Sequence, residues 1–212
     1  MKNFTKNELV EFMHSTIQKT YYGYWNLDEE KYPIMDHAVF ITYRIFDFYR
    51  PKEPLTAGFH RWTREMIKTL SVQHGDRNWV YSRQPVGMYA MDYDGTRTGK
   101  FVDGRVGAHV HALWVLHPEI KESVEWQLEI KQTENMTLRK RKKDELHLNH
   151  QEFEPVYKFF WTPYKKKRSI KYTIGYNLKG VMHKNGYYPG RGDQWDLNYV
   201  DLNKPFATHC FD

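Results

Sequence analysis

Residues 107–116 read Gly-Ala-His-Val-His-Ala-Leu-Trp-Val-Leu, an apolar stretch that contains His109 and His111. Alternate side chains of a β-strand face the same way, so both imidazoles would project from one face while Val110 and Ala112 face the other. Two imidazoles so placed can share one metal ion. Roughly 0.6 such pairs are expected by chance in a chain of this length with 11 histidines. The apolar strand around the pair is therefore the stronger signal, and a structural role for the two histidines is the alternative.

A carboxylate that could join the two histidines lies upstream. Residues 91–95 read Met-Asp-Tyr-Asp-Gly, which is typical of a strand that ends in a turn. If this strand pairs with residues 108–116, Asp92 faces the histidines and completes a site of two histidines and one carboxylate for a divalent cation. Asp94 is the alternative third ligand. The single cysteine, Cys210, excludes a cysteine-rich zinc site.

The segments around the histidine strand predict an α+β domain with a central antiparallel sheet flanked by helices. Apolar periodicity predicts four helices, at about 7–20, 59–74, 118–131 and 170–179. Runs rich in β-branched and aromatic residues predict four strands, at 37–46, 78–93, 108–116 and 153–161. Pro85 indicates an edge strand or a bulge. We find no internal repeat or long linker, so we expect one domain over 1–212 with its core at about 37–180, an N-terminal helix and a turn-rich C-terminal extension.

The composition favours a nucleic-acid partner. The chain of 212 residues has 32 lysines and arginines against 26 aspartates and glutamates, and 17% of its residues are aromatic. A single-stranded nucleic-acid binder needs cations for phosphates and aromatic rings for bases. We expect the phosphate contacts from a basic group around the start of the last helix: Lys165, Lys166, Lys167, Arg168 and Lys171. The candidates for base stacking are Tyr43, Trp79, Tyr81 and Trp161.

Nothing in the sequence predicts a membrane contact. No apolar run approaches the ~20 residues that span a bilayer, and the first residues lack the apolar stretch of a secretory signal. We therefore expect a soluble protein in the cytoplasm.

The predicted last helix carries a second candidate group. Tyr172 and Tyr176 are four residues apart and Lys179 follows three later, so all three lie on one helical face. A phenol with a reference pKa near 10 becomes a nucleophile when a cation, metal or base stands beside it, and Lys179 is such a cation. About 1.2 tyrosine pairs with this spacing are expected by chance, and simple packing is the alternative.

Taken in their order along the chain, these features resemble the HUH endonuclease superfamily of rolling-circle replication initiators (Rep proteins) and relaxases. Residues 39–43 resemble its first motif, an apolar strand, and 109–111 its His-hydrophobic-His metal motif. Residues 172–179 resemble most closely the two-tyrosine motif of bacteriophage initiators. Asp92 takes the place of an acidic ligand that is often Glu in this superfamily. The resemblance covers about 37–180.

The resemblance implies a ferredoxin-like or RRM-like core and a metal-dependent, sequence-specific nickase that also rejoins single-stranded DNA. Mg²⁺ or Mn²⁺ would be held by His109, His111 and Asp92. Tyr176 would attack the scissile phosphate with help from Lys179, and Tyr172 would be a second nucleophile. Such a protein would act at a replication origin of a phage, plasmid or small virus, in the host cytoplasm, beside a separate helicase.

Two other classes of function are also compatible with the sequence. The chain could be a nucleic-acid-binding module without catalysis, in which the histidines are structural and the tyrosines pack. It could also be a divalent-metal hydrolase that uses the histidine pair alone.

Overall fold

A five-stranded sheet forms the centre of the fold. The computed structural model describes residues 4–45, 55–93, 108–129, 157–163, 169–192 and 194–198. The strands of this sheet are β1 (Ala38–Ile45), β2 (Val86–Asp92), β3 (His109–Val115), β4 (Tyr157–Pro163) and β7 (Trp195–Asn198). They lie in the order β4-β1-β3-β2-β7, and every pairing is antiparallel. The predicted α+β class with a central antiparallel sheet is confirmed.

The first four strands follow the ferredoxin-like topology. Helices α2 (Leu55–His74) and α3 (Arg77–Tyr81) connect β1 to β2, and a helix over residues 121–129 lies between β3 and β4. The chain order is thus β-α-β-β-α-β, and the strand order 4-1-3-2 places β1 and β3 in the middle. β7 extends the sheet beyond β2, so the strands β2 and β3, which carry Asp92, His109 and His111, both have a neighbouring strand on each side.

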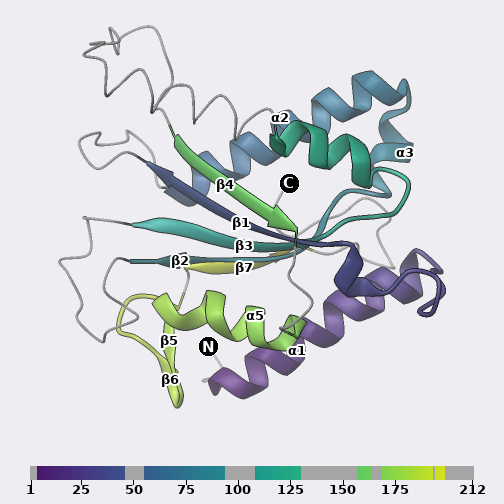
Figure 1. The fold of residues 1–212 in the computed structure, drawn as a ribbon. Helices are drawn as coiled ribbons and strands as arrows, with labels where there is room; N and C mark the ends of the chain where they lie inside the picture. The colour runs from purple at the N-terminus through teal and green to yellow at the C-terminus, as the bar shows by residue number, and fades with distance from the viewer. Residues whose placement is uncertain are drawn as a thin grey trace, which may run out of the picture.

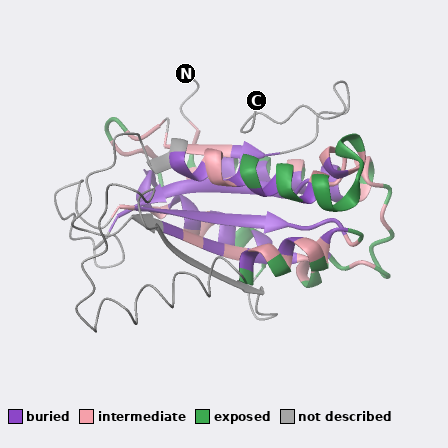
Figure 2. Cartoon of the chain, turned by 90° about the horizontal axis from the view of Figure 1, so that it is seen from above, coloured by how far each residue is buried: buried purple, intermediate pink, exposed green. Residues whose placement is uncertain are grey.

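Helices cover both faces of the sheet (Figure 1). One face carries α2, α3 and the helix over 121–129. The other face carries α1 (Lys6–Gln18) and α5 (Ile170–Asn177), with the hairpin of β5 (Met182–His183) and β6 (Gly186–Tyr187) beside α5. Figure 2 shows the buried strands between these two layers. The remaining short elements are a π-helical turn at Lys19–Tyr24 and 3₁₀ turns at Ile34–Asp36 and Leu178–Gly180.

Local sequence explains where the helices begin and end. Thr5 and Glu8 form a capping box at the start of α1, because each side chain accepts the backbone N–H of the other. α2 ends at Gly75, whose φ of +68° is the left-handed conformation that glycine adopts without strain. Ser169 caps α5 by accepting the Tyr172 backbone N–H.

The core under α2 is aromatic. Trp62 of α2 stacks on Trp114 of β3, with ring centres 5.5 Å apart and planes 8° apart. Tyr43 of β1 is only 1% exposed and packs against Phe59 and Trp62. Tyr43 therefore cannot stack on a nucleic-acid base, and that prediction is wrong because alternation along β1 turns this ring into the core.

The extended segment predicted at 78–93 is half correct. Residues 77–81 form α3, because the Asp76 side chain accepts the Trp79 backbone N–H and so caps a helix. The strand begins only at Val86, and it is an interior strand between β3 and β7. Pro85 thus precedes the strand rather than marking an edge or a bulge. None of the helices among the described residues is long and apolar enough to cross a bilayer.

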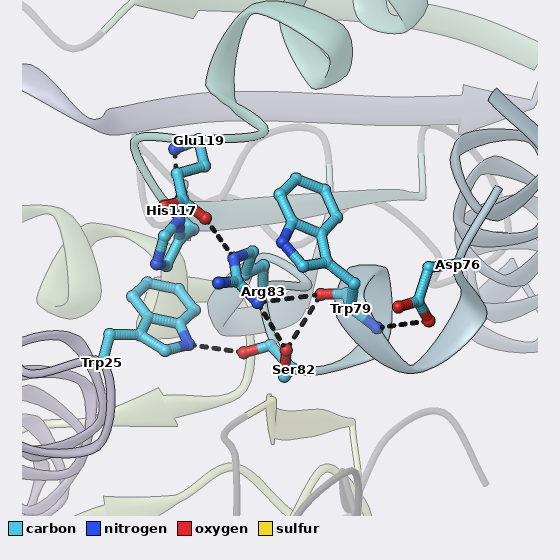
Figure 3. A network of polar contacts seen from close by, with 7 residues as sticks. All are labelled: Trp25, Asp76, Trp79, Ser82, Arg83, His117 and Glu119. Atoms are coloured by element: carbon cyan, nitrogen blue, oxygen red, sulfur yellow. Dashed lines mark hydrogen bonds and ion pairs between the residues drawn. The ribbon is translucent and has the colours of Figure 1, made fainter. Parts of the chain in front are cut away.

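A polar network ties α3 to the end of β3 (Figure 3). The Arg83 guanidinium forms an ion pair with Glu119 and lies 4.5 Å from the centre of the Trp79 ring. This contact occupies one face of Trp79, a candidate for base stacking. His117 accepts the Glu119 backbone N–H, and burial lowers the pKa of His117 to about 4.

The pKa of His117 predicts a loss of stability in mild acid. The unfolded chain takes up this proton near pH 6.5 but folded His117 only near pH 4, so stability falls as the pH drops through that window. In the variant His117→Asn, the new side chain can still accept the Glu119 backbone N–H and so form an Asx turn. We expect the free energy of urea unfolding to differ less between pH 7 and pH 5 in His117→Asn than in the wild type.

The matched control is His183→Asn, because exposed His183 accepts the same type of hydrogen bond from Asn185. An unchanged pH dependence in His117→Asn would contradict the assignment of this proton to His117.

Candidate metal centre and tyrosine helix

The register of β2 and β3 brings three candidate ligands together. Asp92 pairs with His109, and Ala90 pairs with His111, so the carboxylate and both imidazoles project from the same face. Asp92 Oδ2 lies 3.3 Å from His109 Nε2 and 3.2 Å from His111 Nε2. The two Nε2 atoms are 3.1 Å apart. All three side chains are buried, and they could hold a metal ion.

The spacing of these atoms fits a small divalent cation. Ligands bound at about 2.1 Å lie about 3.0 Å apart when they meet at right angles and about 3.4 Å apart in a tetrahedron. The three observed separations, from 3.1 to 3.3 Å, fall between these values. Two nitrogens and one oxygen suit several divalent ions, including Mg²⁺, Mn²⁺ and Zn²⁺, so the identity of the ion stays open. Asp94, the alternative third ligand, lies outside the described residues.

Thr42 orients one of the histidines. Its Oγ1 lies 3.1 Å from His111 Nδ1, and the two residues face each other across β1 and β3. A partner on Nδ1 fixes the ring so that Nε2 points at Asp92, as second-layer contacts do in metal sites. Burial lowers the pKa of His111, which favours the neutral form that binds metals. Thr42 was not among the predicted site residues, because only the strand register reveals it.

Lys179 supplies a positive charge beside the Asp92 carboxylate. Its Nζ lies 2.8 Å from Asp92 Oδ2, the same oxygen that both histidines approach. Burial alone would raise the pKa of Asp92, but the contacts with His109, His111 and Lys179 outweigh it and hold that pKa well below its usual range. Burial would lower the pKa of Lys179, but Asp92 and Tyr176 raise it above its ordinary value. Asp92 is therefore a carboxylate and Lys179 an ammonium at neutral pH.

α5 places one tyrosine beside this group. The Tyr176 ring centre lies 5.5 Å from that of His111 and 6.2 Å from that of Phe40. Lys179 Nζ is 3.9 Å from the centre of the Tyr176 ring, so one ammonium contacts both Asp92 and Tyr176. Tyr172, one turn earlier on α5, is 53% exposed. The structure thus brings Tyr176 and Lys179 to the three candidate ligands and leaves much of the Tyr172 side chain in solvent.

Gly180 permits this close approach. A Cβ at this position would overlap the Met91 carbonyl oxygen and lie 2.7 Å from Asp92 Cα. The Arg191 guanidinium donates to the Gly180 carbonyl at 2.7 Å and so holds the end of the helix in place. This role of Gly180 could not be predicted, because it depends on a contact with β2 that local sequence does not encode.

The predicted basic group is largely untested by the structure. Residues 165–168 lie outside the described residues. Lys171 forms an exposed ion pair with Glu11 of α1, with Nζ 2.7 Å from Oε2. Exposed pairs of this kind contribute little to stability, so Lys171 can exchange Glu11 for another anion at small cost.

Lys179 should compete with a metal ion for Asp92. We expect Lys179→Met to bind Mn²⁺ at least about tenfold more tightly than the wild type in calorimetric titrations. Unit charges about 4 Å apart interact by about 4 kcal/mol at an effective dielectric constant of 20. One third of that energy corresponds to a tenfold change in the dissociation constant of the metal ion. Lys171→Met, which removes the same charge from an exposed position on α5, should leave the affinity within about twofold. Weaker binding in Lys179→Met would contradict the competition.

Gly180→Ala should damage the site by pushing the end of α5 away from β2. We expect a loss of about 1–3 kcal/mol in the free energy of unfolding, as for other overpacked positions, together with weaker Mn²⁺ binding. Gly175→Ala, inside α5, is the matched control, because its Cβ would lie 3.7 Å from Val10 Cγ2, an ordinary contact. That variant should be as stable as the wild type or more so. Equal stability of the two variants would contradict the close approach at Gly180.

Comparisons with known proteins gave no match: no family model, no curated protein and no solved structure is significantly similar to the chain.

Proposed function

We propose that the chain is a metal-dependent endonuclease of the HUH type, which nicks and rejoins single-stranded DNA through a covalent phosphotyrosine. The observation that carries this proposal is the placement of Tyr176 and Lys179 against Asp92, His109 and His111. A tyrosine, a cation and a possible metal site at one point are the groups that attack on a phosphodiester requires.

In this proposal Asp92, His109 and His111 hold Mg²⁺ or Mn²⁺. A divalent ion held there would supply the positive charge that polarises the scissile phosphate and stabilises the negative charge developing on it. The burial of all three ligands keeps competing water away from the carboxylate, which strengthens these electrostatic interactions. Thr42 keeps His111 in its ligand orientation.

Tyr176 supplies the nucleophile. Its oxygen forms a bond to phosphorus while the bond from phosphorus to the 3′ oxygen breaks, and the proton lost by the phenol is balanced by the proton that the 3′ oxygen gains. The products are a 5′-phosphotyrosine and a free 3′-hydroxyl. Lys179 stabilises the negative charge on the phenol oxygen during the attack. Rejoining is the reverse reaction, with a 3′-hydroxyl as the attacking group.

Tyr172 is the proposed second nucleophile. It lies on the same face of α5 as Tyr176, one turn farther from Lys179, and its exposed ring is open to a second strand. The proposed roles therefore differ: Tyr176 makes the first cut, and Tyr172 takes part in a later transfer.

The setting fits a replication initiator. The ferredoxin-like sheet with its ligands on β2 and β3 agrees with the resemblance in the sequence, and the net charge of +6 favours a DNA partner. We propose that the protein starts rolling-circle replication of a phage, plasmid or small virus at an origin in the host cytoplasm. The duplex would be opened by a separate helicase.

An adduct assay tests this function. The wild type is incubated with Mn²⁺ and a labelled library of random single-stranded DNA, and covalent complexes are separated on a denaturing gel. We expect an adduct that disappears with a chelator or in Tyr176→Phe and persists in Tyr172→Phe, which is the matched control one turn away.

The other outcomes each contradict the proposal in a recognisable way. An adduct that survives in Tyr176→Phe would rule out this nucleophile. Metal-dependent cleavage without an adduct would identify a hydrolase that uses the metal site alone. Binding without cleavage at any strand would identify a nucleic-acid-binding module.

A further inference from the structure

A tight turn after the β5–β6 hairpin brings an arginine back to the candidate site. Tyr188, Pro189, Gly190 and Arg191 form this turn, which the Arg191 N–H closes by donating to the Tyr188 carbonyl at 3.1 Å. A proline in the second place and a glycine with a φ of +66° in the third are typical of a type II turn. The backbone that presents the Arg191 side chain is therefore fixed by its local sequence.

The Arg191 guanidinium contacts two segments at once. It donates to the Gly180 carbonyl at 2.7 Å and lies 4.0 Å from the centre of the Tyr93 ring. Both partners are buried, and an arginine this close to an aromatic ring is attracted to it. Gly180 directly follows Lys179 in the chain. Tyr93 directly follows Asp92, so one side chain connects the two segments that form the Lys179–Asp92 ion pair.

Gln194 anchors Arg191 to the same end of β2. Its carbonyl accepts the Met91 N–H at 2.8 Å, and its side-chain oxygen accepts the Tyr93 hydroxyl at 2.7 Å. The Gln194 N–H donates to the Arg191 carbonyl at 3.2 Å. Arg191 is therefore held against β2 by its neighbours, and its bond to Gly180 ties the turn after α5 to that strand.

We infer that Arg191 is a positioning residue of the candidate site. By clamping the 3₁₀ turn at Leu178–Gly180 to the end of β2, it holds the Lys179 ammonium between Asp92 and Tyr176. The groups of a site keep their geometry only when supporting contacts of this kind hold them. The part of the inference that concerns catalysis rests on the proposed function, whereas the effect of Arg191 on metal binding does not.

Loss of this clamp should have opposite effects on metal binding and on reaction. In Arg191→Met, Lys179 is held less firmly and competes less for Asp92, so we expect Mn²⁺ to bind about three- to tenfold more tightly in calorimetric titrations. Adduct formation should slow at least about tenfold, because a misplacement of about 1 Å can cost about a hundredfold in rate. Unlike Gly180→Ala, this change places no new atom against Asp92. A general structural defect would instead weaken metal binding and slow the reaction together.

A double-mutant cycle separates position from charge. In the Lys179→Met background, Arg191→Met should change the Mn²⁺ affinity by less than about twofold, because no ammonium is left to be positioned. Lys184→Met removes the same charge from the exposed turn of the hairpin and should match the wild type in both measurements.

Tyr93 offers a second route to the same clamp if Arg191→Met proves unstable. Tyr93→Leu removes the ring that the guanidinium contacts and should behave like Arg191→Met. Tyr93→Phe keeps the ring and should behave like the wild type. Circular dichroism melting curves show which of these variants remain folded.

The remaining results would each overturn one part of the proposal. Unchanged Mn²⁺ affinity in Arg191→Met, or weaker binding together with a slower reaction, would contradict the positioning role. An equal gain in affinity in the Lys179→Met background would indicate an effect of net charge, and the role of Arg191 would again be wrong. If the wild type forms no adduct, the proposed function is wrong while the metal titrations still decide the role of Arg191. If the wild type binds no Mn²⁺, the metal centre and the role of Arg191 are both wrong.

Discussion

The contact between the Asp92 carboxylate and three nitrogens organises the site. A buried carboxylate is costly unless cations or hydrogen-bond donors surround it, and here Oδ2 meets His109, His111 and Lys179 within 3.3 Å. These contacts tie two other parts of the chain to β2: the histidines tie β3, and Lys179 ties the 3₁₀ turn that follows α5. Together these contacts hold the pKa of Asp92 below its usual range. Lys179, which contacts the same oxygen, also lies against the Tyr176 ring.

The fold supports this contact by fixing its partners on rigid elements. β2 and β3 are interior strands, and His109 and His111 lie between the main-chain ladders to β1 and to β2. The aromatic layer beneath α2 packs the opposite face of the same strands, where Trp62 stacks on Trp114. On the site face, Gly180 allows the end of α5 to approach the backbone of β2 closely. A small change in either layer would therefore shift the distance between Lys179 and Asp92.

Much of this site could be predicted from sequence because it follows from periodicity. Alternation along β3 places His109 and His111 on one face, and helical spacing places Tyr176 and Lys179 together. The pairing of Asp92 with His109 also followed, once adjacent strands were assumed to pair. Thr42 could not be found in this way, because its position beside His111 depends on how β1 pairs with β3. α3 was missed for the opposite reason: a local cap at Asp76 outweighed the strand-like composition that follows.

The most direct test of the metal centre is a crystal structure of the protein soaked in Mn²⁺, with an anomalous difference map. We predict one strong peak about 2.0–2.3 Å from His109 Nε2, His111 Nε2 and an oxygen of Asp92, with Lys179 Nζ displaced from its 2.8 Å contact. No peak at saturating Mn²⁺, or a peak elsewhere with the Lys179–Asp92 contact intact, would contradict it.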